Sequence, residues 1–201
     1  SEMCIRDRIT SQTLETERLI LRAWRADDLE DFYAYASEPG VGERAGWKHH
    51  ETREESRRIL ESFIRAQEVF AVVLRSEQRA IGSLGVHPSW AAELPAFAAP
   101  PGCPPRVKEI GYVLSSAYWG RGLMPEAVRA VIEYAFGTLG LEALTVAHFP
   151  ENVRSKRVIE KCGFAYVKTV ERETRYQTVE PSLEYILRRP ERGAEHRSAR
   201  A

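Results

Sequence analysis

Residues 112–126 read YVLSSAYWGRGLMPE, and this stretch decides the fold. The residues before the glycines predict a strand over 109–114, and the apolar spacing after them predicts a helix over 122–140. Glycines at such a junction let a ligand approach the backbone, and the first N–H groups of the helix lack partners within it. Together with the positive end of the helix dipole, these groups favour an anion such as a pyrophosphate.

The glycine turn taken alone is an unspecific signal. No G-K-[ST] sequence follows the glycines, so this is not a Walker A loop, and the full G-x-G-x-x-G spacing of a dinucleotide-binding fold is missing. A tight strand-to-helix connection that binds nothing would explain the same pattern. The interpretation therefore depends on the rest of the chain.

The composition is that of one ordinary domain. The chain has 201 residues, 43% of them hydrophobic, which is enough to bury a core without disulfides or metals. Its 29 basic and 29 acidic residues balance, which argues against nucleic-acid binding driven by bulk charge. No apolar run approaches the roughly 18 residues of a membrane span. Three scattered cysteines and the absence of a secretory signal pattern favour a cytoplasmic location and support neither a disulfide framework nor a metal cluster.

Changes of hydrophobic period divide the chain into strands and helices. The predicted order is β α α β β β α β α β β, which indicates an α/β fold with a mixed sheet in one domain. Thr52 and Glu55 have the spacing of a capping box at the start of the second helix. The predicted elements are strand 19–24, a helix behind Asp27 and Asp28, a helix from 52, the hairpin 69–75 and 80–86, strand 109–114, helix 122–140, strand 141–149, helix 151–163, and strands 164–170 and 182–188.

Three segments fall outside these elements. Residues 1–13 show no clear period, and we expect an N-terminal appendage before a domain that spans 14–190. Residues 191–201 are charged and rich in small residues, so we expect a flexible tail. The proline-rich segment 88–105 is long for a connection and predicts an irregular loop, either functional or a mobile insertion.

The sequence AYWGRG at 117–122 resembles motif A of the GNAT superfamily of acyl-CoA-dependent N-acetyltransferases, which reads [QR]-x-x-G-x-[GA] after a strand. Ala117 departs from the Gln or Arg of the motif. Because the motif acts mainly through backbone N–H groups, we expect weaker rather than lost phosphate contact. Further segments, in the family's order over about 14–190, resemble its ribosomal-protein N-acetyltransferase branch: LETERLILRAW (14–24), EIGYVL (109–114), YWGRGLMPEA (118–127) and ENVRSKRVIEKCGF (151–164).

The resemblance implies a GNAT-type fold: a mixed, mostly antiparallel central sheet that splays between its fourth and fifth strands, with helices on both faces. It implies acetyl-CoA as co-substrate and no metal. The backbone of Val113 and Leu114 would pair with the pantetheine amides, and an N–H there would face the thioester oxygen. Asn152 and Ser155 would meet the pantetheine arm and the sulfur. The backbone implied to hold the pyrophosphate is that of Trp119, Gly120, Arg121, Gly122, Leu123 and Met124.

The resemblance also implies direct attack of a neutral amine on the acetyl thioester in a ternary complex. Many family members carry a tyrosine acid where this chain has Ile159. Ser155 is the replacement that we favour, because the ribosomal-protein branch carries serine there, and Glu109 is the favoured base, acting through a water. Structural alternatives stay open: Glu109 as a solvated strand-end acid, Ser155 bonded to a helix carbonyl, and Asn152 as an N-cap only.

The acceptor is the least defined partner. A protein N-terminal α-amine is the leading hypothesis, and a small amine (an amino acid, polyamine or antibiotic) is the alternative, because the acceptor pocket would be built from 27–67, 88–105 and the last hairpin. A loop lying over that pocket would narrow it for a small substrate. A non-catalytic acyl-CoA-binding protein and a purely structural domain are further alternatives. We expect neither nucleic acid nor membrane as a partner, and a homodimer stays open. His87 and His148 are weaker candidates for the base.

Overall fold

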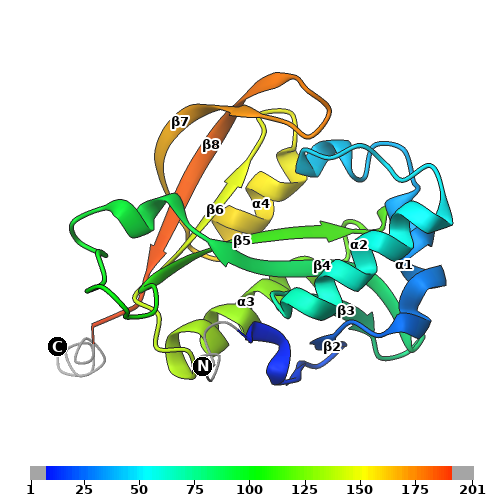
Figure 1. Ribbon diagram of the computed structural model, residues 1–201, viewed down its shortest axis with the longest axis horizontal. Helices are drawn as coiled ribbons and strands as arrows, with labels where there is room; N and C mark the ends of the chain where they lie inside the picture. Colours follow the sequence, from blue (N-terminus) through cyan, green and yellow to red (C-terminus); the bar gives the residue numbers. More distant parts are fainter. Residues whose placement is uncertain (1–7, 192–201) are drawn as a thin grey trace, which may run out of the picture.

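Eight strands form one sheet in the computed structural model, which describes residues 8–191 (Figure 1). The strand order is β1-β2-β3-β4-β5-β6-β8-β7, and neighbouring strands are antiparallel except β5 and β6, which are parallel. The predicted α/β class with a mixed, mostly antiparallel sheet is therefore confirmed. The strands are β1 (Leu14–Glu15), β2 (Leu19–Ala23), β3 (Val69–Leu74), β4 (Arg79–Pro88), β5 (Val107–Leu114), β6 (Ala143–His148), β7 (Ala165–Glu173) and β8 (Val179–Arg188), and the α-helices in this range are α1 (Leu29–Ala36), α2 (Arg53–Ala66), α3 (Leu123–Gly137) and α4 (Val153–Lys161).

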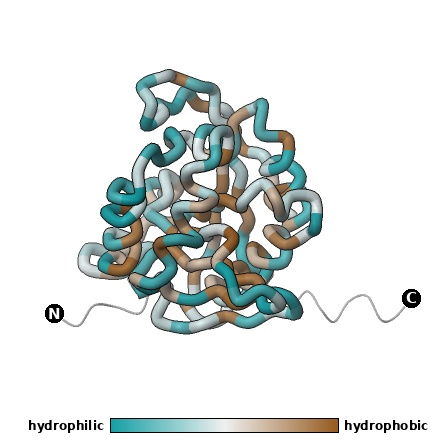
Figure 2. Tube along the Cα trace, turned by 90° about the vertical axis from the view of Figure 1, so that its right-hand side faces the viewer, coloured by the Kyte–Doolittle hydropathy of each residue, from teal (hydrophilic) through white to brown (hydrophobic). Residues whose placement is uncertain are grey.

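The helices cover both faces of the sheet. Because side chains alternate along a strand, Ile110 and Leu114 of β5 pack into the core shared with α3 and α4, whereas Val113 packs into the core formed by α1 and α2. β3 lies between these two cores and is buried along its whole length. Figure 2 shows the hydrophobic segments gathered inside the molecule, with hydrophilic segments along its outer helices and turns.

β5 and β6 separate part-way along their length. Their parallel pairing runs from Val107 with Ala143 to Ile110 with Val146. β5 then continues to Leu114, paired with β4 along its other edge. These are the fourth and fifth of the predicted strands, so the predicted splay lies where the resemblance implied it.

Local sequence sets the start of two helices. The Thr52 hydroxyl accepts a hydrogen bond from the Glu55 N–H at 3.1 Å, which caps α2 as predicted. The Glu55 carboxylate instead accepts from the Glu51 N–H at 2.9 Å, so only half of the expected capping box forms. α3 begins directly after Gly122, whose φ of 73° lies in the left-handed region that favours glycine.

The proline-rich segment 88–105 is packed onto one end of the sheet, at the edge of the molecule opposite α1 and α2 in Figure 1. Ala91 and Phe97 are buried against Val107 and Ala143 at the beginning of β5 and β6. The segment also contains a 3-10 helix, η5 (Trp90–Glu93), so the prediction of a wholly irregular segment is wrong there. This 3-10 helix is stabilised by a cap that composition alone does not reveal, because the Ser89 hydroxyl accepts from the Ala91 N–H at 3.1 Å.

The described part of the domain begins before the expected boundary at residue 14. Residues Ile9–Ser11 form a 3-10 helix, and Ile9 is fully buried in the core shared with α3. The Tyr134 hydroxyl donates to the Ile9 carbonyl at 3.0 Å. The rest of the expected appendage, residues 1–7, and residues 192–201 of the expected tail lie outside the described residues.

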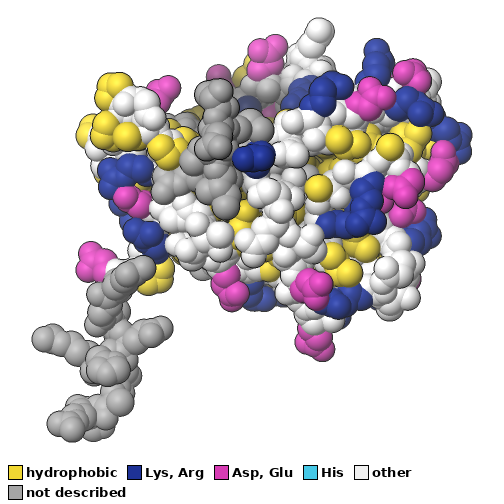
Figure 3. Space-filling model, turned by 60° about the horizontal axis from the view of Figure 1, so that its bottom comes forward, with side chains coloured by type: hydrophobic (Ala, Val, Ile, Leu, Met, Phe, Trp, Pro, Cys, Tyr) yellow, Lys and Arg dark blue, Asp and Glu magenta, His cyan; other side chains and the backbone are white. Residues whose placement is uncertain are grey.

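Within residues 8–191, no helix is both long enough and apolar enough to cross a membrane. The same residues contain no group of three or more His, Cys, Asp or Glu side chains placed to hold a metal ion. Figure 3 shows Lys and Arg side chains interspersed with Asp and Glu over the face that it views, so the overall charge balance also holds locally there.

The burial of Ile9 generates a stability prediction. Ile9→Ala should lower the free energy of unfolding by about 3 kcal/mol, because it removes buried methyl groups and leaves a cavity beside α3. Gln12→Ala, at an exposed position three residues further on, is the control and should change it by less than about 0.5 kcal/mol. Urea denaturation of the three proteins measures both values. Equal stability of all three would show that the residues before 14 are an appendage after all.

Candidate active site

Two cavities meet where β5 and β6 separate. One, of about 290 Å³, lies among the end of β5, the following turn, α3 and α4. The other, of about 400 Å³, lies on the side of α1, α2 and the β7–β8 hairpin. Both are lined by Tyr112 and Val113 of β5 and by Asn152 and Ser155 at the start of α4. The split in the sheet therefore joins the cavity on the α3 and α4 side, called the first cavity, to the one on the other side, called the second cavity.

The first cavity contains nearly all of the residues that the resemblance assigned to the co-substrate. The exception is Arg121, whose guanidinium packs over the Tyr118 ring, 5.4 Å from its centroid. Its charge therefore lies outside the lining, although its backbone stays in the turn. The assigned residues that do line this cavity are Val113, Leu114, Trp119, Gly120, Gly122, Leu123, Met124, Asn152 and Ser155.

The turn between β5 and α3 presents unpaired donors to the first cavity. Gly120 and Gly122 have φ of 74° and 73°, which directs the chain sharply into the helix. The backbone N–H groups over 120–124 donate to no acceptor among the residues that the structure describes. Four cationic side chains also line this cavity: Arg44, Arg154, Arg157 and Lys161. The combination is chemically suited to an anion with several phosphates.

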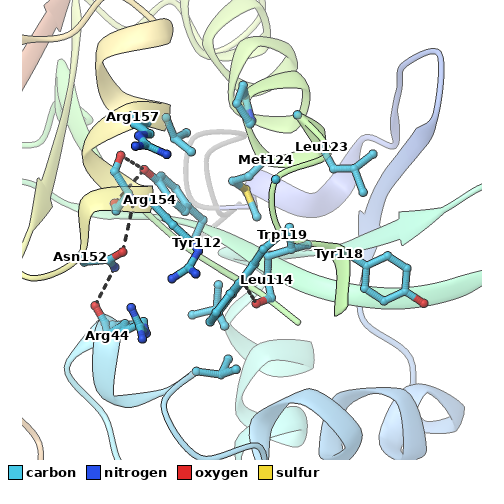
Figure 4. Close-up of a pocket in the computed structure, with 18 of the residues that line it drawn as sticks. Arg44, Tyr112, Leu114, Tyr118, Trp119, Leu123, Met124, Asn152, Arg154 and Arg157 are labelled. Carbon is cyan, nitrogen blue, oxygen red and sulfur yellow. Dashed lines mark hydrogen bonds between the residues drawn. The ribbon is translucent and has the colours of Figure 1, made fainter. Parts of the chain in front are cut away.

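Trp119 lies in the first cavity beside two arginines (Figure 4). The guanidinium carbon of Arg154 lies 4.1 Å, and that of Arg44 5.4 Å, from the centroid of its ring. The indole N–H donates to the Leu114 carbonyl at 2.8 Å, which occupies one acceptor that was assigned to the pantetheine arm. Asn152 fixes the neighbouring loop, because its amide donates to the Arg44 carbonyl at 3.1 Å.

Asn152 is also the N-cap of α4, because its side-chain oxygen accepts from the Ser155 N–H at 3.1 Å. Both of its polar atoms therefore have protein partners. The N-cap is therefore present, and the ligand contact of Asn152, which lines both cavities, stays a prediction.

Ser155 has a side-chain partner that the sequence analysis missed. The Tyr112 hydroxyl lies 3.0 Å from the Ser155 hydroxyl and donates to the Ser155 carbonyl at 3.3 Å. Burial raises the pKa of Tyr112, so this hydroxyl stays protonated. Strand alternation was the available signal, because it places Tyr112 on the same face as Ile110 and Leu114, towards α4. Ile159, at the position of the family's tyrosine, is 1% exposed and belongs to the core.

Glu109 lines the second cavity, on the opposite face of β5 from Tyr112. Its carboxylate is 18% exposed and lies 3.4 Å from a guanidinium nitrogen of Arg172. Burial is the largest influence and raises the pKa of Glu109, Arg172 opposes it, and the negative charge of Glu184 adds to the rise. A buried carboxyl with a raised pKa in a cavity has the chemistry of a general base.

The two histidines differ in their surroundings. His87 faces Glu109 across β4 and β5 and lines the second cavity, with its Nδ1 3.4 Å from the Glu68 carboxylate. His148 is 5% exposed, and both of its ring nitrogens have partners: the Phe149 carbonyl at 2.8 Å and the Tyr185 hydroxyl at 3.2 Å. His148 also lines the second cavity, but its burial and its two partners make it a packed histidine.

Comparisons with known proteins agree with this arrangement. Residues 18–165 match the family model described as the acetyltransferase (GNAT) domain. The chain is 29% identical over 156 residues to YoaA, an uncharacterized N-acetyltransferase of Bacillus subtilis, which covers 75% of this chain and 81% of YoaA.

Two solved structures share the fold. One is a ribosomal-protein-S5-alanine acetyltransferase from Vibrio fischeri, with a TM-score of 0.67 and 20% identity, covering 90% of this chain and 98% of that one. The other is the microcin C7 self-immunity acetyltransferase MccE in complex with acetyl-CoA and AMP, with a TM-score of 0.70 and 14% identity, covering 87% and 94%. At these identities the likeness concerns the fold alone.

The chain belongs to the GNAT acetyltransferase family, as its motifs indicated. It is therefore an N-acetyltransferase, and the activity of this family is acetyl transfer to an amine. The solved structures of similar fold include a ribosomal-protein acetyltransferase, the branch that the sequence resembles.

Proposed function

We propose that this chain transfers the acetyl group of acetyl-CoA to a primary amine by direct attack in a ternary complex, and that the acceptor is a protein N-terminal α-amine. The observation that carries this proposal is the meeting of two cavities at Tyr112, Val113, Asn152 and Ser155. A thioester in one cavity and an amine in the other would approach each other at this opening. A single closed pocket would offer no such arrangement.

The first cavity fits acetyl-CoA in its charge and its donors. The unpaired N–H groups over 120–124 suit the pyrophosphate, and the arginines and lysine around them suit the remaining phosphate. The exposed edge of β5 beyond Ile110 has no strand partner and would pair with the amides of the pantetheine arm. An N–H on this edge would also stabilise the thioester oxygen as it gains negative charge.

The chemistry requires an acceptor nitrogen without its proton and a proton for the departing thiolate. Glu109 would remove the proton through a water while the nitrogen forms a bond to the carbonyl carbon. The carbon–sulfur bond then breaks, and the Ser155 hydroxyl would give its proton to the sulfur. Tyr112 would orient this step if its single proton turned from the Ser155 carbonyl to Ser155 Oγ, because the serine proton would then be free to point at the sulfur.

A small amine is the second candidate acceptor, and it is favoured by a bridge that would restrict access to the second cavity. The tip of the β7–β8 hairpin is joined to the loop before α2: the Arg175 N–H donates to the Gly46 carbonyl at 2.8 Å, and the Tyr176 hydroxyl donates to the Glu43 carbonyl at 3.3 Å. This bridge crosses beside the second cavity, which Arg175 and Gly46 both line. The segment 88–105, which was expected to narrow the acceptor pocket, contributes no residue to its lining.

The choice between acceptors is a prediction with a direct measurement. After incubation with acetyl-CoA, mass spectrometry should find an added acetyl group on N-terminal peptides and little on a panel of free amino acids, polyamines and aminoglycosides. Acetylation confined to the small amines would replace the leading acceptor with the second one. Tight acetyl-CoA binding without any product would identify the chain as a non-catalytic member of the family.

The phosphate-binding role of the turn is tested by Gly122→Val. A branched side chain should clash with the bound pyrophosphate and disturb its N–H donors, which should weaken acetyl-CoA binding by about a hundredfold, equivalent to about 3 kcal/mol. Gly102→Val is the control, because Gly102 also has a positive φ but lies in the segment 88–105; an added Cβ would have nothing within 4 Å at Gly102 and only the Arg18 side chain, at 3.6 Å, at Gly122. Both variants carry similar backbone strain, so isothermal titration should separate the two. Equal affinities would contradict the assignment of the turn.

The acid role of Ser155 predicts a loss of turnover without a loss of binding. Ser155→Ala should lower kcat by about a hundredfold, the lower end of the usual effect of a general acid. Tyr112→Phe removes one orienting hydrogen bond and should lower kcat by about tenfold. Tyr166→Phe, which removes an exposed hydroxyl on β7, is the control and should leave kcat unchanged. Unchanged kcat in Ser155→Ala would exclude Ser155 as the acid.

A further inference from the structure

Three charged side chains from three strands meet on the acceptor side of the sheet. Arg172 of β7 lies between Glu109 of β5 and Glu184 of β8. One guanidinium nitrogen is 2.9 Å from Glu184 Oε1, and the other is 3.4 Å from Glu109 Oε1. The guanidinium is thus shared unequally between two carboxylates, and the shorter contact goes to Glu184.

Glu184 is the member of this trio that cannot be hydrated. Its side chain is 1% exposed, and its second carboxylate oxygen accepts from the Trp90 indole N–H at 3.0 Å. A buried carboxylate needs a charged partner, because the loss of hydration is otherwise uncompensated. Glu184 therefore anchors Arg172, and Trp90 ties this anchor to the packed segment 88–105.

Glu109 is paired more weakly than the carboxylates that an arginine of this protein holds with two hydrogen bonds. Arg22 holds Asp28 with two hydrogen bonds of 2.8 Å, and Arg106 holds Glu142 with two of 2.6 Å. Glu109 receives a single contact of 3.4 Å from Arg172. A fully paired carboxylate is a poor base, because the cation stabilises its ionised form. Because its contact with Arg172 is weak, the Glu109 carboxylate remains able to accept a proton.

Two further residues face Glu109, and neither is among the charges that act on its pKa. His87 of β4 lies directly opposite, and its ring contacts Glu68, which follows α2. Thr145 of β6 lies beside Glu109 in the parallel pairing; it is uncharged and lowers the pKa of Glu109 through a hydrogen bond. Arg172 and Glu184 are the charged groups that act on the pKa of Glu109, in opposite directions.

We propose that Glu184 is a positioning residue for Glu109: by holding Arg172, it keeps the guanidinium from closing onto the proposed base. This inference rests on the proposed function for its catalytic meaning, although the interaction itself is a property of the protein without substrates. Glu184 touches no reacting atom. It acts through Arg172, and the segment 88–105 contributes through Trp90 although it lines neither cavity.

The test is a titration of the Glu109 carboxylate by 13C NMR in the free protein. In Glu184→Gln, the released guanidinium should close onto Glu109, and the loss of a neighbouring negative charge acts in the same direction. The midpoint should therefore fall by about one pH unit. In Arg172→Gln the midpoint should rise, because the attractive charge is gone. Glu142→Gln, which makes the same change in an ion pair away from the cavity, is the matched control and should leave the midpoint unchanged.

The double variant Arg172→Gln with Glu184→Gln separates an indirect from a direct effect. If Glu184 acts through Arg172, adding Glu184→Gln to Arg172→Gln should move the midpoint much less than it does in the natural chain. An equal shift in both backgrounds, or no shift in either, would overturn the proposal. A lower melting temperature with an unmoved midpoint would likewise reduce Glu184 to a structural residue.

Kinetics distinguish this inference from the proposed function. In Glu184→Gln, the acid limb of the kcat/KM profile should follow the NMR midpoint to lower pH, because a base acts only when deprotonated. Glu109→Gln should remove this limb. If Glu109→Gln keeps the natural profile while the NMR midpoints move as expected, the base assignment fails and the positioning of Arg172 by Glu184 stands.

Discussion

The site depends on the end of backbone pairing between β5 and β6. The N–H and C=O groups along a strand edge need partners, and beyond Ile110 and Val146 neither strand supplies them to the other. Trp119 occupies one of these groups through its indole N–H, and α4 fills part of the widened space with Ser155. The rest of the edge stays open to an extended ligand. Because β4 and β8 hold the outer edges of the two strands, the opening persists without loosening the sheet.

The opening also explains why charge is distributed as it is. The first cavity is lined by cationic side chains and unpaired N–H donors. The second cavity contains the Glu109 carboxylate, which shares Arg172 with the buried carboxylate of Glu184. Phosphate binding needs donors that cost no rearrangement, and the turn at 120–122 provides them through two left-handed glycines. A base needs the opposite, an ionisable group that its neighbours do not saturate. The sheet keeps these requirements apart.

Much of this arrangement could be predicted from local sequence. The glycine turn, the cap at Thr52 and the order of elements each depend on residues close together in the chain. Contacts between distant residues could not be predicted in this way. Tyr112 contacts Ser155 because the fold places α4 next to the end of β5. Phe97 is buried because it packs against the first residues of β5 and β6. Glu184 looked like one more strand residue, because nothing local reveals the arginine on its neighbouring strand.

The alternation of β5 finally accounts for how one strand could serve both halves of a reaction. Glu109 and Tyr112 are separated by three positions, an odd number, so their side chains leave the sheet on opposite faces. Along the strand the two positions are about 10 Å apart, which is too far for direct transfer between them. A base on one face and an acid on the other would act on one amine and one thioester only where the sheet is open, and Val113 lies at that opening. If Glu109 is the base and Ser155 the acid, as proposed, this distance would call for a water between Glu109 and the amine, because the thioester would lie nearer to Ser155.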